Sequence, residues 1–140
     1  MDLTIIVLVL LAGIAAWWAS QQGVMMLMSS EEVVNRLADA IATAEGYWSP
    51  SSLPNRLNNP GDLKDSKGNL IHFDTPEEGW AALRKQVRMM LTGTSKIYRP
   101  DMTIRQVAQL YTGGDNPEGW AQTVAAQFGV DPDRSLYELA

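Results

Sequence analysis

Apolar residues recur every three or four positions in four stretches of the chain, which is the spacing that places them on one face of an α-helix. The first stretch begins at Ser29 and Glu32, a pair that matches an N-terminal capping box, and it ends at Gly46. The second begins at residues 75–78 (TPEE), another capping-box pattern with proline at the first helical position, and stops at Gly93. We expect these two helices to bury Val33, Leu37, Ala40, Ile41 and Ala44, and Trp80, Leu83, Val87, Met90 and Leu91.

Two more helices are predicted towards the C-terminus. Residues 103–106 (TIRQ) mark the start of one, and residues 111–115 (YTGGD) interrupt it. Residues 116–118 (NPE) begin the next helix, and Gly129 is placed to cap its C-terminus. A final short helical turn is expected within residues 131–139. The side chains expected to face inward are Ile104, Val107 and Leu110 on the first of these helices, and Trp120, Val124 and Phe128 on the second.

Residues 48–74 keep no helical period, and prolines and glycines interrupt them repeatedly. Residues 65–68 (DSKG) have the composition of a turn. Leu63 before this turn and residues 70–73 (LIHF) after it are typical of a short two-stranded hairpin. The pattern therefore predicts a mainly α domain over residues 31–140, with one small β hairpin inserted after its first helix.

The N-terminus differs from the rest, because Leu3 to Ala19 carry no charge and Trp17 and Trp18 close the run. This length lies at the short end of the roughly 17–25 residues that span a bilayer as a helix. We expect a transmembrane anchor helix over residues 1–22 and a short linker over residues 23–30. The alternatives are a helix buried inside a larger particle and a cleaved signal peptide, which would normally start with Lys or Arg.

Composition excludes several kinds of chemistry. The net charge of −5 offers no basic face to displace the counterions of nucleic acid, which also disfavours a helix-turn-helix DNA binder built on the helices around Ile104 and Val124. The chain has no cysteine, and its one histidine is His72, so thiolate chemistry and a multi-histidine metal site are excluded. We expect no nucleic-acid partner, no metal and no cofactor. Any hydrolytic chemistry must depend on carboxylates.

Glu45 is the carboxylate best placed for such chemistry. It lies one turn beyond Ile41, at the edge of the apolar stripe and just before the proline- and glycine-rich segment. Partial burial disfavours the charged form of a carboxylic acid and raises its pKa, so that it can donate a proton near neutral pH. The alternative is an ordinary solvated glutamate in the last turn of a helix, where negative charge is slightly unfavourable.

Four segments occur in an order and spacing that resemble those of phage lysozyme-like domains related to the soluble lytic transglycosylases. They are residues 44–47 (AEGY), 58–63 (NNPGDL), 73–80 (FDTPEEGW) and 130–133 (VDPD). The resemblance implies a lysozyme-like fold and cleavage of the β-1,4 bond between N-acetylmuramic acid and N-acetylglucosamine in peptidoglycan. In that superfamily the catalytic glutamate ends the first long helix of the domain, and Glu45 is the matching residue.

A sugar-binding groove needs aromatic faces and polar side chains, and this chain offers several near the ends of its predicted helices. A hydrolase also needs a second carboxylate, for which Asp62, Asp65 and Asp74 are candidates, whereas a lytic transglycosylase manages with one acid. Asp65 and Asp74 are explained equally well as a turn residue and a solvated charge, which leaves Asp62. The substrate-binding residues that we predict are Tyr47, Asn58, Asn59, Asp62, Tyr111 and Thr112, and Trp48 is a further aromatic candidate.

The sequence thus predicts a phage virion-associated lytic transglycosylase that acts on peptidoglycan glycan strands at the bacterial cell wall during entry. Residues 1–28 would connect it to a membrane or to other virion proteins. Muramidase activity is one alternative. Another is a structural virion protein that keeps the lysozyme-like fold without catalysis, because Glu45 is followed by Gly46 where the transglycosylases have serine, and a Gly-Leu-Met-Gln signature is absent.

Overall fold

The structure is a computed structural model that describes residues 30–139. Within that range it contains five α-helices and one 3-10 helix, so the predicted mainly helical class is confirmed. The hydrophobic anchor and all of its linker except Ser30 lie outside the described residues. Between residues 30 and 139 no helix has both the length and the apolar character needed to cross a bilayer. In chain order the elements are α2 (Ser30–Ala44), α3 (Leu53–Arg56), α4 (Pro76–Thr92), α5 (Ile104–Tyr111), α6 (Pro117–Phe128) and η1 (Leu136–Leu139).

Local sequence signals set the ends of these helices. The Thr103 hydroxyl accepts from the backbone N–H of Gln106, whose side chain accepts from the N–H of Thr103, so the predicted start of α5 is confirmed and the two residues form a capping box. The capping box predicted for α4 forms in part. The Thr75 hydroxyl accepts from the N–H of Glu78 as expected, but the Glu78 carboxylate accepts from the N–H of Asp74 instead of that of Thr75. Left-handed glycines end α4 and α6, as the sequence predicts.

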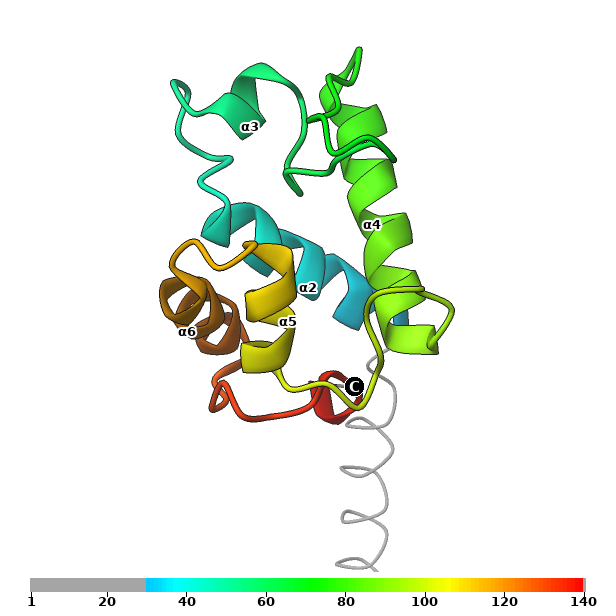
Figure 1. Ribbon diagram of the computed structural model, residues 1–140, viewed down its shortest axis with the longest axis vertical. Helices are drawn as coiled ribbons and strands as arrows, with labels where there is room; N and C mark the ends of the chain where they lie inside the picture. The colour runs from blue at the N-terminus through cyan, green and yellow to red at the C-terminus, as the bar shows by residue number, and fades with distance from the viewer. Residues whose placement is uncertain (1–29, 140) are drawn as a thin grey trace, which may run out of the picture. The chain divides into compact units, whose positions relative to one another are not determined.

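One buried cluster joins α2, α4, α5 and α6, and in Figure 1 α2 lies between α4 and the α5–α6 pair. The apolar stripes predicted for α2 and α4 are buried, with Ala44, Trp80 and Leu91 only partly so. Leu110 is the exception, because 49% of its surface is exposed. On α5 the buried side is centred on Ile104, Val107 and Ala108, and Leu110 lies roughly 100° around the helix from that centre.

The segment between α2 and α4 differs from the prediction in two ways. It contains the short helix α3, capped by Ser52 with Pro54 in its first turn. The expected β hairpin is reduced to a single antiparallel bridge between Lys64 and Leu70, and residues 30–139 contain no named strand. Beside this bridge, the N–H of Ile71 donates to the carbonyl of Leu63 at 3.0 Å. The Asn59 amide group donates to the carbonyls of Leu63 and Ile71, both at 2.9 Å, so this buried side chain joins the two arms of the turn.

Candidate active site

Glu45 directly follows α2, and its backbone N–H still donates to the carbonyl of Ile41 at 2.9 Å. Gly46 then adopts a left-handed conformation with φ of 75°, which turns the chain away from the helix. The carboxylate is therefore held by a rigid helix end, while the side chain stays half-buried, as the sequence analysis expects. This placement is suitable for an acid that must reach a ligand without being surrounded by water.

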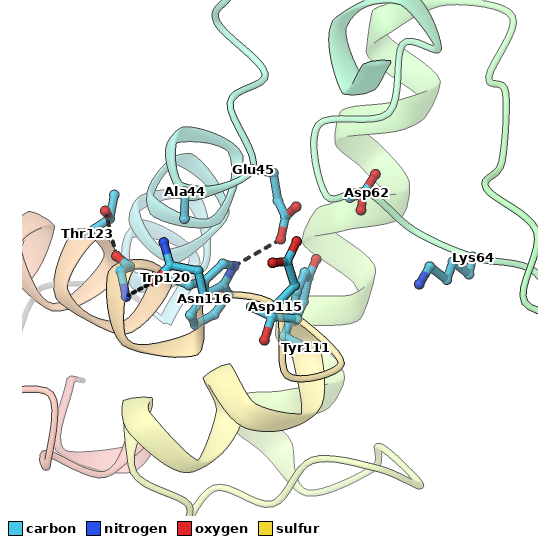
Figure 2. Close-up of a pocket in the computed structure, with 11 residues that line it drawn as sticks. Ala44, Glu45, Asp62, Lys64, Tyr111, Asp115, Asn116, Trp120 and Thr123 are labelled. Carbon is cyan, nitrogen blue, oxygen red and sulfur yellow. Dashed lines mark hydrogen bonds between the residues drawn. The ribbon is translucent and has the colours of Figure 1, made fainter. Parts of the chain in front are cut away.

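The Glu45 side chain lines a cavity of about 430 Å³, which lies within the range of roughly 300–1,000 Å³ that small-ligand sites usually have. Figure 2 shows Glu45 entering from the α2 side, with Asp62 and Lys64 on the facing side. The connection between α5 and α6 supplies another part of the wall. The residues that line the cavity are Ala44, Glu45, Asp62, Lys64, Tyr111, Thr112, Asp115, Asn116, Gly119, Trp120 and Thr123.

The cavity changes the acidity of Glu45. Burial and the nearby charge of Asp62 raise the pKa of its carboxyl to about 7, against opposing effects of the Trp120 hydrogen bond and the Lys64 charge. A carboxylic acid with this pKa is about half protonated at neutral pH, so it can both donate and accept a proton there. The pKa of Asp62 is also raised by burial, although Lys64 partly offsets this effect.

Trp120 holds the Glu45 carboxyl in place. Its indole Nε1–H donates to Oε1 of Glu45 at 2.9 Å, and its side chain is buried on α6. From the sequence we predict Trp120 only as a core residue, so this contact is an addition to the predicted site. A signal was available, because a buried tryptophan usually finds a hydrogen-bond acceptor for its N–H group.

A row of aromatic rings continues from Trp120 into the interior. The Tyr111 ring lies 5.0 Å from that of Trp120, and Tyr98 follows at 6.0 Å from Tyr111. The Tyr111 hydroxyl donates to the carbonyl of Gly61. At Gly61 a Cβ atom would come within 2.7 Å of Cδ1 of the buried Leu83 side chain, so a larger residue here would force that side chain to move. The tyrosine therefore fixes the turn that presents Asp62, which itself has a left-handed φ of 50°.

The structure brings four of the predicted site residues together and separates three. Glu45, Asp62, Tyr111 and Thr112 line the cavity. Tyr47 does not, because it is 7% exposed and packs edge-on against Trp48 and Trp80. Tyr47 therefore does not contribute to the wall of this cavity, and its role in sugar binding stays a prediction. Trp48 lies outside the cavity as well, with 59% of its surface exposed.

The two predicted amides serve the turn instead of the cavity. Asn59 is fully buried, and its Oδ1 accepts from the N–H of Leu63 at 2.8 Å, so both ends of its amide are occupied. Asn58 donates to the carbonyl of Phe73 at 3.0 Å. Neither side chain lines the cavity, and Asn59 has no exposed surface with which to contact a ligand. The other acidic candidates lie outside it too: the Asp65 carboxylate accepts from two backbone N–H groups of its own turn, and Asp74 is exposed.

Other polar residues of the cavity are absent from the sequence prediction. Asn116 caps α6 and lines the cavity, and Thr123 lines it from about two turns further along that helix. Asp115 adds a further carboxylate from the glycine-rich connection after α5. Lys64 follows Asp62 by two residues. The break at residues 111–115 was the only sequence signal for this wall, and it indicated a loop without indicating which way its side chains point.

Within residues 30–139, no group of three or more histidine, cysteine, aspartate or glutamate side chains is arranged to hold a metal ion. Comparison of the chain with models of protein families, with curated proteins and with solved structures gives no match.

Proposed function

We propose that this protein is a peptidoglycan lytic transglycosylase that cleaves the β-1,4 bond between N-acetylmuramic acid and N-acetylglucosamine, with Glu45 as its acid and base. One observation carries the proposal: a half-buried carboxyl with a pKa of about 7 faces a ligand-sized cavity and is oriented by a buried indole N–H. These are the properties that an acid catalyst of glycosidic cleavage requires. The motif resemblance described above supplies the substrate.

The proposed reaction needs one carboxyl group that works twice. Protonated Glu45 donates its proton to the glycosidic oxygen while the bond between that oxygen and C1 of the muramyl sugar breaks. The resulting carboxylate then takes the proton of the C6 hydroxyl of the same sugar, whose oxygen bonds to C1 and closes a 1,6-anhydro ring. Glu45 is protonated again at the end, and no water is consumed. A pKa near 7 suits both steps at neutral pH.

The other cavity residues have supporting roles in this proposal. The indole of Trp120 keeps the carboxyl of Glu45 in one orientation. The side chains of Thr112, Asn116 and Thr123 offer polar groups to the hydroxyl and acetamido groups of the sugars. We further propose that the protein belongs to a phage virion and opens the cell wall locally during entry, connected to a membrane or to virion proteins through residues 1–28.

Hydrolysis is the second candidate, because Asp62 lines the same cavity and its charge raises the pKa of Glu45. In a muramidase this carboxylate would stabilise the developing positive charge at C1 or activate a water molecule. The products distinguish the two reactions. A transglycosylase leaves 1,6-anhydromuramic ends, whereas a muramidase leaves reducing ends.

The test is digestion of purified peptidoglycan by the full-length protein in a mild detergent, followed by mass spectrometry of the products. We expect anhydro products from the wild type and a rate about a thousandfold lower for Glu45→Gln. Asp74→Asn is the matched control, because Asp74 is exposed and outside the cavity, and it should keep the wild-type rate. Reducing products that disappear in Asp62→Asn would assign the protein as a muramidase. A folded wild type with no activity from acid to alkaline pH would leave the non-catalytic structural role.

A further inference from the structure

A second cavity, of about 330 Å³, adjoins the one that contains Glu45. The two cavities share the wall formed by Asp62, Lys64 and Tyr111. The aromatic row passes beneath both, since Trp120 lines the first cavity, Tyr111 lines both and Tyr98 lines the second. A ligand that occupies the Glu45 cavity can therefore extend into the second one without leaving the surface of the protein.

The second cavity has a different chemical character from the first. Apart from the shared tyrosine, its walls include the side chains of Leu63, Ile97, Tyr98 and Leu110. Ile97 is 60% exposed and Leu110 is 49% exposed, although both are large and apolar. Together they give the cavity an apolar rim, whereas the Glu45 cavity is lined mainly by hydroxyl, amide and carboxyl groups. Exposed apolar groups at the edge of a polar site are typical of a surface that a ligand covers.

Two polar side chains in the second cavity are available to a ligand. Within the described part of the chain, the amide of Gln86 makes no hydrogen bond and the ammonium of Lys64 forms no ion pair within 4.0 Å. Asp65 also lines this cavity, but backbone N–H groups of Lys67 and Asn69 occupy its carboxylate. The cavity thus combines apolar contact area, an amide and a cation.

We propose that the second cavity binds the short peptide that N-acetylmuramic acid carries on its lactyl group, so that the preferred ligand is a peptide-bearing glycan. This inference rests on the proposed function, because it takes the Glu45 cavity to hold the sugars. A lactyl-peptide branch presents methyl groups, which suit Ile97 and Leu110. It also presents amides and carboxylates, which suit Gln86 and Lys64. A further stretch of glycan would present mainly hydroxyl and acetamido groups to the same apolar rim.

The test measures binding rather than turnover. Full-length protein carrying Glu45→Gln is titrated with a disaccharide muropeptide and with the same disaccharide after removal of its peptide, using tryptophan fluorescence or calorimetry. We expect the peptide-bearing ligand to bind about tenfold more tightly, which is the size of effect that a few apolar contacts give. The added double change Ile97→Ser and Leu110→Ser should remove this preference and leave the affinity for the bare disaccharide unchanged.

Leu53→Ser is the matched control, because Leu53 is 43% exposed, apolar and outside both cavities, so the preference should persist. Thermal unfolding verifies that each variant is folded. Equal affinity for the two ligands, or no binding of either, would overturn the inference. If the double change lowered the affinity for both ligands equally, the inference would also be overturned, and the second cavity would be assigned to binding of the glycan. If the protein binds the peptide-bearing ligand more tightly but the wild type does not cleave peptidoglycan, the proposed catalysis is overturned and the peptide-binding inference stands.

Discussion

Acidic side chains in two regions of this domain have opposite environments. On the surface, Glu31 of α2 receives two hydrogen bonds of 2.8 Å from the guanidinium of Arg88, and the pKa of Glu31 is lowered chiefly by them. Glu118 of α6 is bonded to Arg105, which likewise lowers its pKa. In the cavity, Glu45 has an indole as its hydrogen-bond partner, and burial together with Asp62 raises its pKa to about 7.

The difference shows what distinguishes a structural acid from one that is suited to proton transfer. An arginine partner favours the charged form, so the pKa of the carboxyl moves even further below neutral pH. A neutral donor such as the Trp120 indole orients the carboxyl and leaves its proton exchangeable. The surface acids should therefore stabilise the fold above acidic pH, whereas Glu45 should oppose folding in its charged form.

The largest expected effect is that of Glu45→Gln, which should lower the rate of cleavage and raise the stability of the fold at alkaline pH. In the unfolded chain the pKa of Glu45 is 4.5. Below this pH the Glu45 carboxyl is protonated in both the folded and the unfolded state, so it does not make stability depend on pH. As pH rises from 4.5 to about 7, only the folded state retains the proton, and the wild type loses stability relative to its maximum. Glu45→Gln removes this cost and should raise the free energy of unfolding by on the order of 1–2 kcal/mol at alkaline pH, after allowance for solvent screening.

Urea unfolding at about pH 4 and about pH 8 measures this effect. The variant should be the more stable protein only at the higher pH, while its cleavage of peptidoglycan falls about a thousandfold. Asp74→Asn provides the comparison for a surface carboxylate outside the cavity, and it should change neither quantity appreciably. If Glu45→Gln lowered stability equally at both pH values, Glu45 would be a structural acid like Glu31.

The second prediction concerns the indole. Trp120→Phe keeps an aromatic ring beside Tyr111 but removes the N–H donor that favours the charged form of Glu45. The pKa of Glu45 should rise further, so the alkaline limb of the pH–rate profile should move to higher pH, and kcat should fall about tenfold because the carboxyl loses its orientation. A purely structural role for Trp120 predicts a lower rate without a displaced profile. Trp80→Phe, on a tryptophan outside the cavity, is the control.

The features that sequence reasoning predicted correctly are those determined by neighbouring residues. Thr103 with Gln106, Asn116 before Pro117, and Gly129 after Phe128 fix helix ends through contacts within one turn. The half-burial of Glu45 follows equally from its place at the end of an apolar stripe. These inferences need no knowledge of what lies across the domain.

The features that it missed depend on partners far along the chain. The hydrogen bond between Trp120 and Glu45 joins residues 75 positions apart in the sequence, and the bond between the Tyr111 hydroxyl and Gly61 joins residues 50 positions apart. No local pattern distinguishes a tryptophan that packs in the core from one whose N–H also reaches a carboxyl. Asn59 was misassigned for the same reason, because only the folded turn shows that the carbonyls of Leu63 and Ile71 satisfy its amide.

The smallest expected effect is at the surface pair of Glu31 and Arg88. Substitution of the acid should lower stability here, whereas it should raise stability at Glu45. Glu31→Gln removes the negative charge and one of the two oxygens that accept hydrogen bonds from Arg88, in a pair whose side chains are 56% and 44% exposed. The pKa of Glu31 is lowered from 4.5 on folding, so its contribution to stability is present above that value and is lost as pH falls through the folded pKa. Because exposed ion pairs are weak, the melting temperature at neutral pH should fall by only about 1–2 °C, and the loss should shrink in high salt.

Scanning calorimetry from neutral to acidic pH tests this, with a convergence of the wild-type and Glu31→Gln melting temperatures expected at the acidic end. A melting temperature that instead rose at neutral pH would mean that Glu31, like Glu45, is destabilised by its surroundings, and the contrast between the two regions would be lost.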